Sequence, residues 1–256
     1  MTRPLLLAVV GNTHTRLARL DGGRLADAES LPTRDLAAHG GRPGLLAAHP
    51  DWPVLAACVV PEAAALLRHA WPGRHFRFLD AALAATELDL TACAAATVGA
   101  DRLANAVAGL TLSAPPFLVV DCGTAISTAA VDDRRRFRGG AILPGRSLWR
   151  RALKLHTAQL PEIELQEAFP PALGTDTRAA ILAGCDAGVL GAVRQLVEAS
   201  RHELDAPGCP VFVTGGGASF FLRHLGGLAL TPAPADFTLR GLARLAPAAW
   251  PQTPPG

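Results

Sequence analysis

The sequence has no tyrosine, one methionine and a single lysine, Lys154, among its 256 residues. It has no excess of charge of one sign either, because 24 basic and 22 acidic residues leave a net charge of +2. The basic cluster at residues 134–138 stands between strand-like segments and is expected at an exposed hairpin tip. These observations exclude a basic nucleic-acid-binding face, and no nucleic-acid partner is expected.

Long apolar runs and paired cysteines are also missing. No stretch reaches the ~18–20 uncharged residues of a membrane span, so no membrane association is expected. The short apolar run that follows Pro4 leads directly into a turn, which is typical of a buried strand rather than of a signal peptide. The five cysteines are scattered without a CxxC pair, which excludes a disulfide framework and a cysteine zinc site. A reduced, cytoplasmic protein is the prediction.

Half of the residues are apolar, and they form short runs that alternate with helical patterns. The run at 54–60 is followed by Pro61, a residue suited to the first turn of a helix. The segment at 211–225, "VFVTGGGASFFLRHL", repeats this strand-then-helix arrangement late in the chain. The alternation predicts an α/β protein whose sheets are covered on both faces.

An internal repeat divides the chain. The segment 6–21, "LLAVVGNTHTRLARLD", resembles 118–133, "LVVDCGTAISTAAVDD", with Gly11 placed on Gly123 and Val9 on Asp121. Each copy is a strand, a tight glycine turn, a strand and a polar turn. The repeat predicts two domains on one plan, residues 1–115 and 116–256. Glycine turns let backbone N–H groups approach phosphate closely, so we expect a nucleotide clamped in a cleft between the two turns.

Several motifs, in this order along nearly the whole chain, resemble those of the type III pantothenate kinases, members of the acetate and sugar kinase/Hsc70/actin superfamily. The motifs are "GNTHTR" (11–16), "GADRLANAVAG" (99–109), "DCGTAISTAAVD" (121–132), "GGAILPGRSLWRRAL" (139–153), "GTDTRAAILAGCDAGVLGAV" (174–193) and "TGGGAS" (214–219). The resemblance implies two ribonuclease H-like (actin-like ATPase) domains with a nucleotide cleft between them. It also implies phosphorylation of pantothenate by ATP, the first step of coenzyme A biosynthesis.

The resemblance assigns the substrate site to Gly99, Ala100, Asp101, Arg102 and Thr177. Asp101 matches the general base that takes the proton from the primary hydroxyl of pantothenate, and a carboxylate suits this role. The residues themselves leave simpler alternatives open. Asp101 could cap the helix that follows it, and Thr177 could do the same for its own helix.

The remaining assignments concern ATP and its ions. The resemblance gives nucleotide contacts to the following residues: Gly11, Asn12, Thr13, Arg16, Thr124, Gly215 and Gly216. Asp121 matches a ligand of a monovalent cation, K⁺ or NH₄⁺, beside ATP and Mg²⁺. The alternatives are an Asp121 that only bonds to turn amides and a plain strand-to-helix turn at 215–217.

Three features depart from the family pattern. Arg16 stands where the family has a lysine, and it should keep the phosphate contact with a forked geometry in place of a point charge. Val9 stands where the family has an aspartate that helps to hold Mg²⁺, and the segment 91–98 has no aromatic residue to contact pantothenate. A nucleotide-binding homologue without catalytic activity, or another small-molecule kinase, therefore stays open as an alternative function.

The segment 139–161 is expected to place a Gly-Pro turn before an amphipathic helix, and the resemblance implies that this segment borders the active site and a homodimer interface. We expect its apolar residues, Leu148, Ala152 and Leu155, to point inward. Its charges, including those of Arg146 and Arg150, are expected in solvent or at the interface.

Overall fold

The computed structural model describes residues 4–70 and 75–250. Within this part of the chain, contacts group the residues into two compact units. Unit 1 contains residues up to 114 together with 133–138 and 235–250, and unit 2 contains 115–132 and 139–234. The chain thus returns to unit 1 twice, at 133–138 and at 235–250, and the predicted division into residues 1–115 and 116–256 did not include these two segments.

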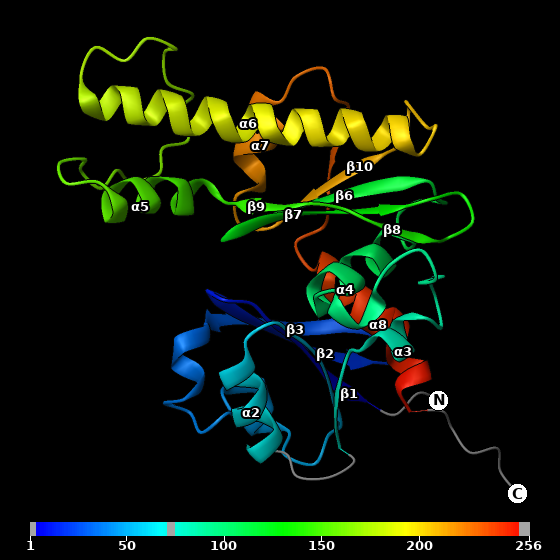
Figure 1. The fold of residues 1–256 in the computed structure, drawn as a ribbon. Helices are drawn as coiled ribbons and strands as arrows, with labels where there is room; N and C mark the ends of the chain where they lie inside the picture. The colour runs from blue at the N-terminus through cyan, green and yellow to red at the C-terminus, as the bar shows by residue number, and fades with distance from the viewer. Residues whose placement is uncertain (1–3, 71–74, 251–256) are drawn as a thin grey trace, which may run out of the picture. The chain divides into compact units, whose positions relative to one another are not determined.

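The sheet of unit 1 has the strand order β3-β2-β1-β4-β5 (Figure 1). Its strands are β1 (Leu5–Val10), β2 (His14–Asp21), β3 (Arg24–Pro32), β4 (Val54–Cys58) and β5 (Phe76–Phe78). The first three are antiparallel neighbours joined by short turns, whereas β4 and β5 run parallel to β1. Parallel pairing requires a crossover, and α2 (Pro61–Ala70) provides the one between β4 and β5.

Both faces of this sheet are covered. Leu6, Ala8 and Val10 pack into a core with residues of α1 (Gly44–Ala48) and α2. Side chains alternate along a strand, so the buried Leu7 points to the opposite face. That face receives α4 (Ala100–Gly109) and α8 (Phe237–Ala249), while α3 (Ala81–Ala84) packs beside them. Short 3₁₀ turns at Thr33–Leu36 and Ala95–Thr97 complete unit 1.

The sheet of unit 2 has the order β11-β10-β6-β7-β8, which matches the order in unit 1 read in reverse. Its strands are β6 (Phe117–Cys122), β7 (Ala125–Val131), β8 (Phe137–Gly139), β9 (Ile142–Pro144), β10 (Val211–Thr214) and β11 (Leu230–Pro232). β9 pairs with β7 and has no counterpart in the sheet of unit 1. The helices are α5 (Arg146–His156), α6 (Thr177–Glu203) and α7 (Ala218–His224).

α6 is the helix of the described part whose length and mean hydropathy, 1.4, would suffice for a membrane span. In the structure 44% of that span is buried within the protein. Val189, Val193 and Val197 of α6 pack into the core of unit 2 against residues of β6 and β10. Its hydropathy is accounted for by this packing.

The internal repeat is confirmed as a structural repeat, with one correction. β1-β2 and β6-β7 are equivalent hairpins, and each closes on its glycine. Gly11 N–H donates to His14 O at 3.0 Å, whereas Gly123 N–H donates to Ala125 O at 3.1 Å. The second turn is one residue shorter, so the ungapped alignment is wrong beyond it.

The packing of α8 on α4 leads to a stability prediction. A Cβ added to Gly241 would overlap the carbonyl oxygen of Ala104 and lie 3.2 Å from Ala108 N. Backbone cannot move aside without separating the two helices, so Gly241→Ala should destabilise the protein by about 1–3 kcal/mol, the usual range for overpacking. Denaturant unfolding measures the change.

Gly184→Ala is the matched control, since Gly184 lies within α6 with nothing within 4 Å of its added Cβ. Alanine is favoured over glycine in helices by about 0.8–1 kcal/mol, so this variant should be more stable than the wild type. Equal destabilisation by both changes would contradict the packing argument.

Candidate active site

The first glycine turn, residues 11–14, is fixed by its neighbours in unit 1. Thr33 Oγ1 donates to Gly11 O at 2.6 Å, and Thr33 N–H donates to Thr13 O at 2.9 Å. The side chains of Asn12 and Thr13 are exposed at the tip of the turn. The turn is therefore a rigid loop with an accessible polar tip, which suits an anionic ligand.

Val9 and Arg16 are directly opposite each other in the β1-β2 register. Side chains of opposite residues in an antiparallel pair lie on the same face of the sheet. Val9 is partly buried, and Arg16 Nη1 donates to the carbonyl of Ala235 at 3.3 Å. The predicted nucleotide contact Arg16 thus lies beside an isopropyl group where an acid would have been its natural partner.

The segment 99–102 begins α4 close to this turn. Gly99, not Asp101, is the N-cap of the helix, and Asp101 lies in the first turn with Oδ1 accepting from Arg102 N–H at 2.8 Å. A Cβ on Gly99 would lie 2.6 Å from Asp101 Oδ1 and 3.8 Å from Val59 Cγ1. Val59 in turn donates its N–H to Val10 O at 3.1 Å. Unit 1 therefore brings the first glycine turn and Asp101 to the same edge of its sheet.

The carboxyl group of Asp101 has a perturbed proton affinity. Burial raises the pKa of Asp101, and the N–H and positive charge of Arg102 oppose the rise without cancelling it. Burial also lowers the pKa of Arg102, whose guanidinium Cζ lies 5.6 Å from the ring centroid of Phe137. A carboxylate made more basic in this way is suited to accept a proton.

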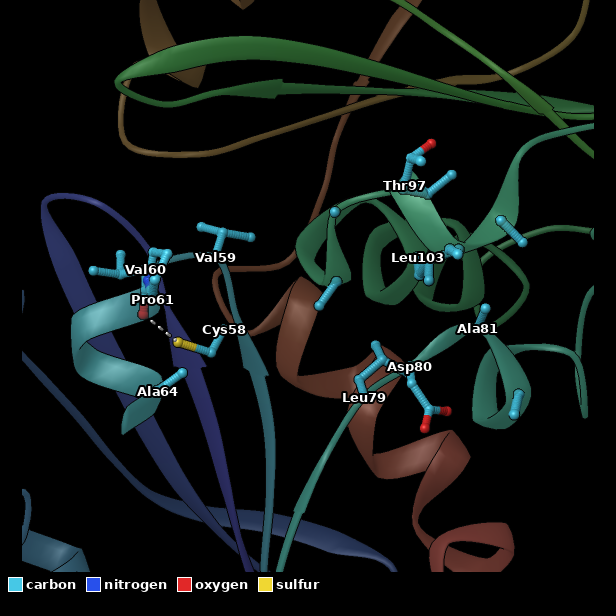
Figure 2. A pocket seen from close by; sticks show the side chains of 16 residues that line it. Cys58, Val59, Val60, Pro61, Ala64, Leu79, Asp80, Ala81, Thr97 and Leu103 are labelled. Carbon is cyan, nitrogen blue, oxygen red and sulfur yellow. Dashed lines mark hydrogen bonds between the residues drawn. The ribbon is translucent and has the colours of Figure 1, made fainter. Parts of the chain in front are cut away.

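A pocket of about 900 Å³ in unit 1 is lined by Gly99, Ala100 and Leu103 of the α4 start, although Asp101 itself is not part of the lining. Figure 2 shows Val59, Val60 and Pro61 on one side of it and Thr97 and Leu103 on the other. Gly99 and Ala100 line the pocket, and Asp80 is the one charged residue of the lining. Crevices at the carboxyl ends of parallel strands are the usual ligand sites of α/β sheets, and this pocket adjoins the ends of β4 and β5.

The second glycine turn carries Asp121 and Thr124 in unit 2. Gly215 follows β10 with a φ of +90°, a conformation that favours glycine. A Cβ at this position would lie 2.5 Å from Asp121 Oδ1. Gly217 N–H donates to Cys122 O at 2.8 Å, so the Gly215–Gly217 segment lies against the end of β6. Asp121, Gly215 and the exposed Gly216 are thus close neighbours.

Thr177 is the first residue of α6 and is exposed. Asp176, not Thr177, caps this helix, since Asp176 Oδ1 accepts from Ala179 N–H at 2.8 Å. The hydroxyl of Thr177 is therefore not required for capping. The prediction that Gly11 and Gly123 face each other across one cleft, and the roles given to the residues of both turns, stay predictions.

The helix α5 contradicts the expected orientation of its charges. Arg146 and Arg150 are 6% and 1% exposed, whereas Leu155 is 69% exposed. Both guanidinium groups bind the fully buried carboxylate of Asp186 on α6, with Nε of Arg146 at 3.0 Å and Nη2 of Arg150 at 2.9 Å. Buried charges occur where they are paired, and the pairing turns Arg146 and Arg150 inward. Of the residues expected inward, Leu148 is partly buried, whereas Ala152 and Leu155 are exposed.

The sequence contained a signal for this ion pair that we did not use. Asp186 is the lone acid in the apolar stretch of α6, and Arg146 and Arg150 are spaced i, i+4 on one face of α5. A single acid in an apolar helix needs a buried cation as its partner. Composition alone does not say which helix supplies that cation.

The side chains of the described residues limit the kind of metal site that the protein can form. No group of three or more His, Cys, Asp or Glu side chains that could hold a metal occurs among residues 4–70 and 75–250. Mg²⁺ in nucleotide sites commonly binds one or two carboxylates, phosphate oxygens and waters. The described residues therefore fit a Mg²⁺ ion held largely by a nucleotide and not an all-protein metal cage.

Comparison with known proteins defines the class first. A Baf family protein from Campylobacter jejuni superposes with a TM-score of 0.61 over 95% of this chain and 98% of its own, at 18% identity. The MreB5 protein of Spiroplasma citri, solved bound to ADP, gives 0.53 over 96% and 97% at 11% identity. These similarities concern the fold alone. The chain has the fold of the actin-like ATPases and sugar kinases, with two similar α/β units.

Sequence similarity then gives the family. Residues 5–199 match the family model described as type III pantothenate kinase. The type III pantothenate kinase of Synechococcus elongatus is 36% identical over 198 residues, 77% of this chain and 76% of the relative. The chain belongs to the type III pantothenate kinase family, as its motifs predicted.

Proposed function

We propose that the protein phosphorylates pantothenate with ATP, giving 4'-phosphopantothenate and ADP. Family membership supports this activity. The observation that carries it is the partly buried Asp101, a carboxylate of raised pKa that directly follows Gly99 and Ala100, two lining residues of the pocket at the carboxyl edge of the unit 1 sheet. A base in this position can activate an alcohol that enters the pocket.

Asp101 acts as the general base. Its carboxylate takes the proton of the primary hydroxyl of pantothenate as that oxygen forms a bond to the γ-phosphorus of ATP. The bond between this phosphorus and the β,γ-bridging oxygen breaks, and ADP leaves. Arg102 binds the carboxylate or amide oxygens of pantothenate, for which a guanidinium offers several donors. Gly99 and Ala100 leave room for the substrate, and the hydroxyl of Thr177 hydrogen-bonds to it.

The two glycine turns hold the nucleotide. Backbone N–H groups of Gly11, Asn12 and Thr13 bind its phosphates together with the charge of Arg16, and Thr124 contributes a hydroxyl from the second turn. Gly215 and Gly216 let the backbone approach the adenine side. Mg²⁺ supplies charge neutralisation of the phosphates when it is bound with ATP, and Asp121 is the ligand of a K⁺ or NH₄⁺ ion.

Asp101→Asn tests the proposed base by two measurements, turnover and Tm, which should change in opposite directions. Turnover should fall by about 10²-fold or more, the usual contribution of a positioned base. The pKa of Asp101 is raised by folding, so its ionised form destabilises the folded protein above that pKa. The neutral Asn should therefore raise Tm at neutral pH, and the gain should vanish below about pH 4, where Asp is protonated even when unfolded.

Asp80→Asn is the control, since Asp80 lines the same pocket, is exposed and caps α3 through a bond that Asn can also make. It should leave turnover and Tm nearly unchanged. Full activity of Asp101→Asn would show that another group is the base.

Val9→Asp tests the contribution of the absent acid. The wild type should need a high Mg²⁺ concentration for turnover, because one carboxylate near the metal–phosphate unit is missing. Val9→Asp should lower that requirement and raise turnover. Arg16 on the opposite strand can pair with the new charge, so the loss of stability should be small compared with that of an unpaired buried carboxylate. Steady-state assays across a Mg²⁺ series measure the effect.

Val9→Asn separates charge from shape, because asparagine has nearly the size of aspartate without its charge. Val9→Asn should therefore not lower the Mg²⁺ requirement. Equal Mg²⁺ dependence in the wild type and Val9→Asp would show that the acid is dispensable. ATP binding without phosphoryl transfer in both proteins would instead favour a nucleotide-binding homologue without kinase activity. A protein that does not bind ATP would contradict the kinase proposal outright.

We also propose that the enzyme is a cytoplasmic homodimer. Five large apolar side chains are exposed between residues 142 and 173 of unit 2, namely Ile142, Leu155, Leu165, Phe169 and Leu173. A contiguous exposed apolar patch is typical of an interaction surface, and we propose that some of these side chains form one. Sedimentation velocity should give twice the chain mass, and Leu155→Glu should shift it to the monomer. The same change at Leu112 in unit 1, also exposed, should not.

A further inference from the structure

We propose that Arg146 is a positioning residue for nucleotide binding, which it supports by joining three segments of unit 2. The inference rests on the proposed kinase function, since it concerns the nucleotide that this function requires. It starts from the guanidinium of Arg146, which is nearly inaccessible to solvent and yet has four separate contacts. Two go to Asp186, one to the carbonyl of Gln166 and one to the ring of Phe220.

The first segment joined is the second glycine turn. Gly145, directly before Arg146, donates its N–H to Thr124 O at 3.0 Å. A Cβ on Gly145 would overlap the carbonyl oxygen of Gly123 and lie 2.5 Å from that of Thr124. The backbone that begins α5 is therefore pressed against the turn, and a shift of Arg146 would be transmitted to Gly123 and Thr124.

The second segment is the glycine-rich turn before α7. The guanidinium Cζ of Arg146 lies 3.3 Å from the ring centroid of Phe220, a close stacking contact with the aromatic face. Phe220 N–H donates to Gly217 O at 3.2 Å, and Gly217 is bonded to Cys122 O. Arg146 thus orients the residue that follows Gly215 and Gly216, whose backbone is proposed to approach the nucleotide.

The third segment is α6. Nε and Nη2 of Arg146 donate to the two oxygens of Asp186 at 3.0 and 3.3 Å, in the forked geometry that only arginine provides. Arg150 shares the carboxylate at 2.9 Å and also donates to Arg146 O at 3.0 Å. It has no ring contact with Phe220. Arg150 is therefore a useful comparison, since it is also buried and also bonded to Asp186, through one hydrogen bond where Arg146 makes two.

Arg146→Lys keeps the positive charge but removes the fork and the planar stack on Phe220. The Kd of a non-hydrolysable ATP analogue, measured by calorimetry, should rise about tenfold, in keeping with the sensitivity of sites to small displacements. The KM for pantothenate should change by less than about twofold. The proposed pantothenate contacts are in unit 1 except for Thr177, and Thr177 precedes Asp186, the residue of α6 that Arg146 binds, by more than two helical turns. Arg150→Lys should lower Tm as much without changing the Kd of the analogue.

Equal Kd values for the wild type and Arg146→Lys, or an equal rise in Arg150→Lys, would overturn the proposal, since both results indicate a role in stability alone. If Arg146→Lys fails to fold, Phe220→Leu serves as the second variant. It keeps apolar bulk but removes the ring face, and it should raise the Kd in the same direction. An unchanged Kd would again overturn the proposal. Absence of phosphopantothenate in assays of the wild type would contradict the kinase function. The Kd values of the ATP analogue would still decide whether Arg146 supports nucleotide binding.

Discussion

The organisation of both units depends on one backbone hydrogen bond at the end of the first strand. In unit 1 the carbonyl of Val10 accepts from Val59, and in unit 2 the carbonyl of Cys122 accepts from Gly217. Each bond attaches the segment after the parallel neighbouring strand to the strand that leads into the glycine turn. A buried carbonyl needs such a partner, and satisfying it brings distant parts of the chain together. Asp101 is placed beside Val59 in this way, and Gly215 beside Asp121.

Much of this arrangement could be predicted from the sequence because its signals are local. The apolar runs, the glycines and the turn residues of each repeat lie within about twenty residues of one another, and they predicted the α/β class and the paired hairpins. Features that depend on distant partners were not predictable. The difference of one residue between the two glycine turns could be seen only once the strand register was known. The inward face of α5 depended on Asp186, which lies 36 residues beyond Arg150. The pocket required β4, β5 and α4 to be assembled.

The two glycine turns differ in charge although they share one plan. At equivalent positions the first has Val9 opposite Arg16, and the second has Asp121 opposite Ser127. At this pair of positions the first hairpin therefore has a basic residue and no acidic residue, whereas the second has an acidic residue and no basic residue.

The return of the chain to unit 1 has a consequence for the order in which the protein is made. Residues 115–132 and 139–234 of unit 2 are synthesised before α8, which begins at Phe237. α8 covers one face of the first sheet through β1, β4 and α4. The hydrophobic face formed by β1 and β4 therefore stays without its final cover until α8 has been synthesised. The unit that contains the N-terminal strands completes its core last, and during translation it is the part that needs protection from aggregation.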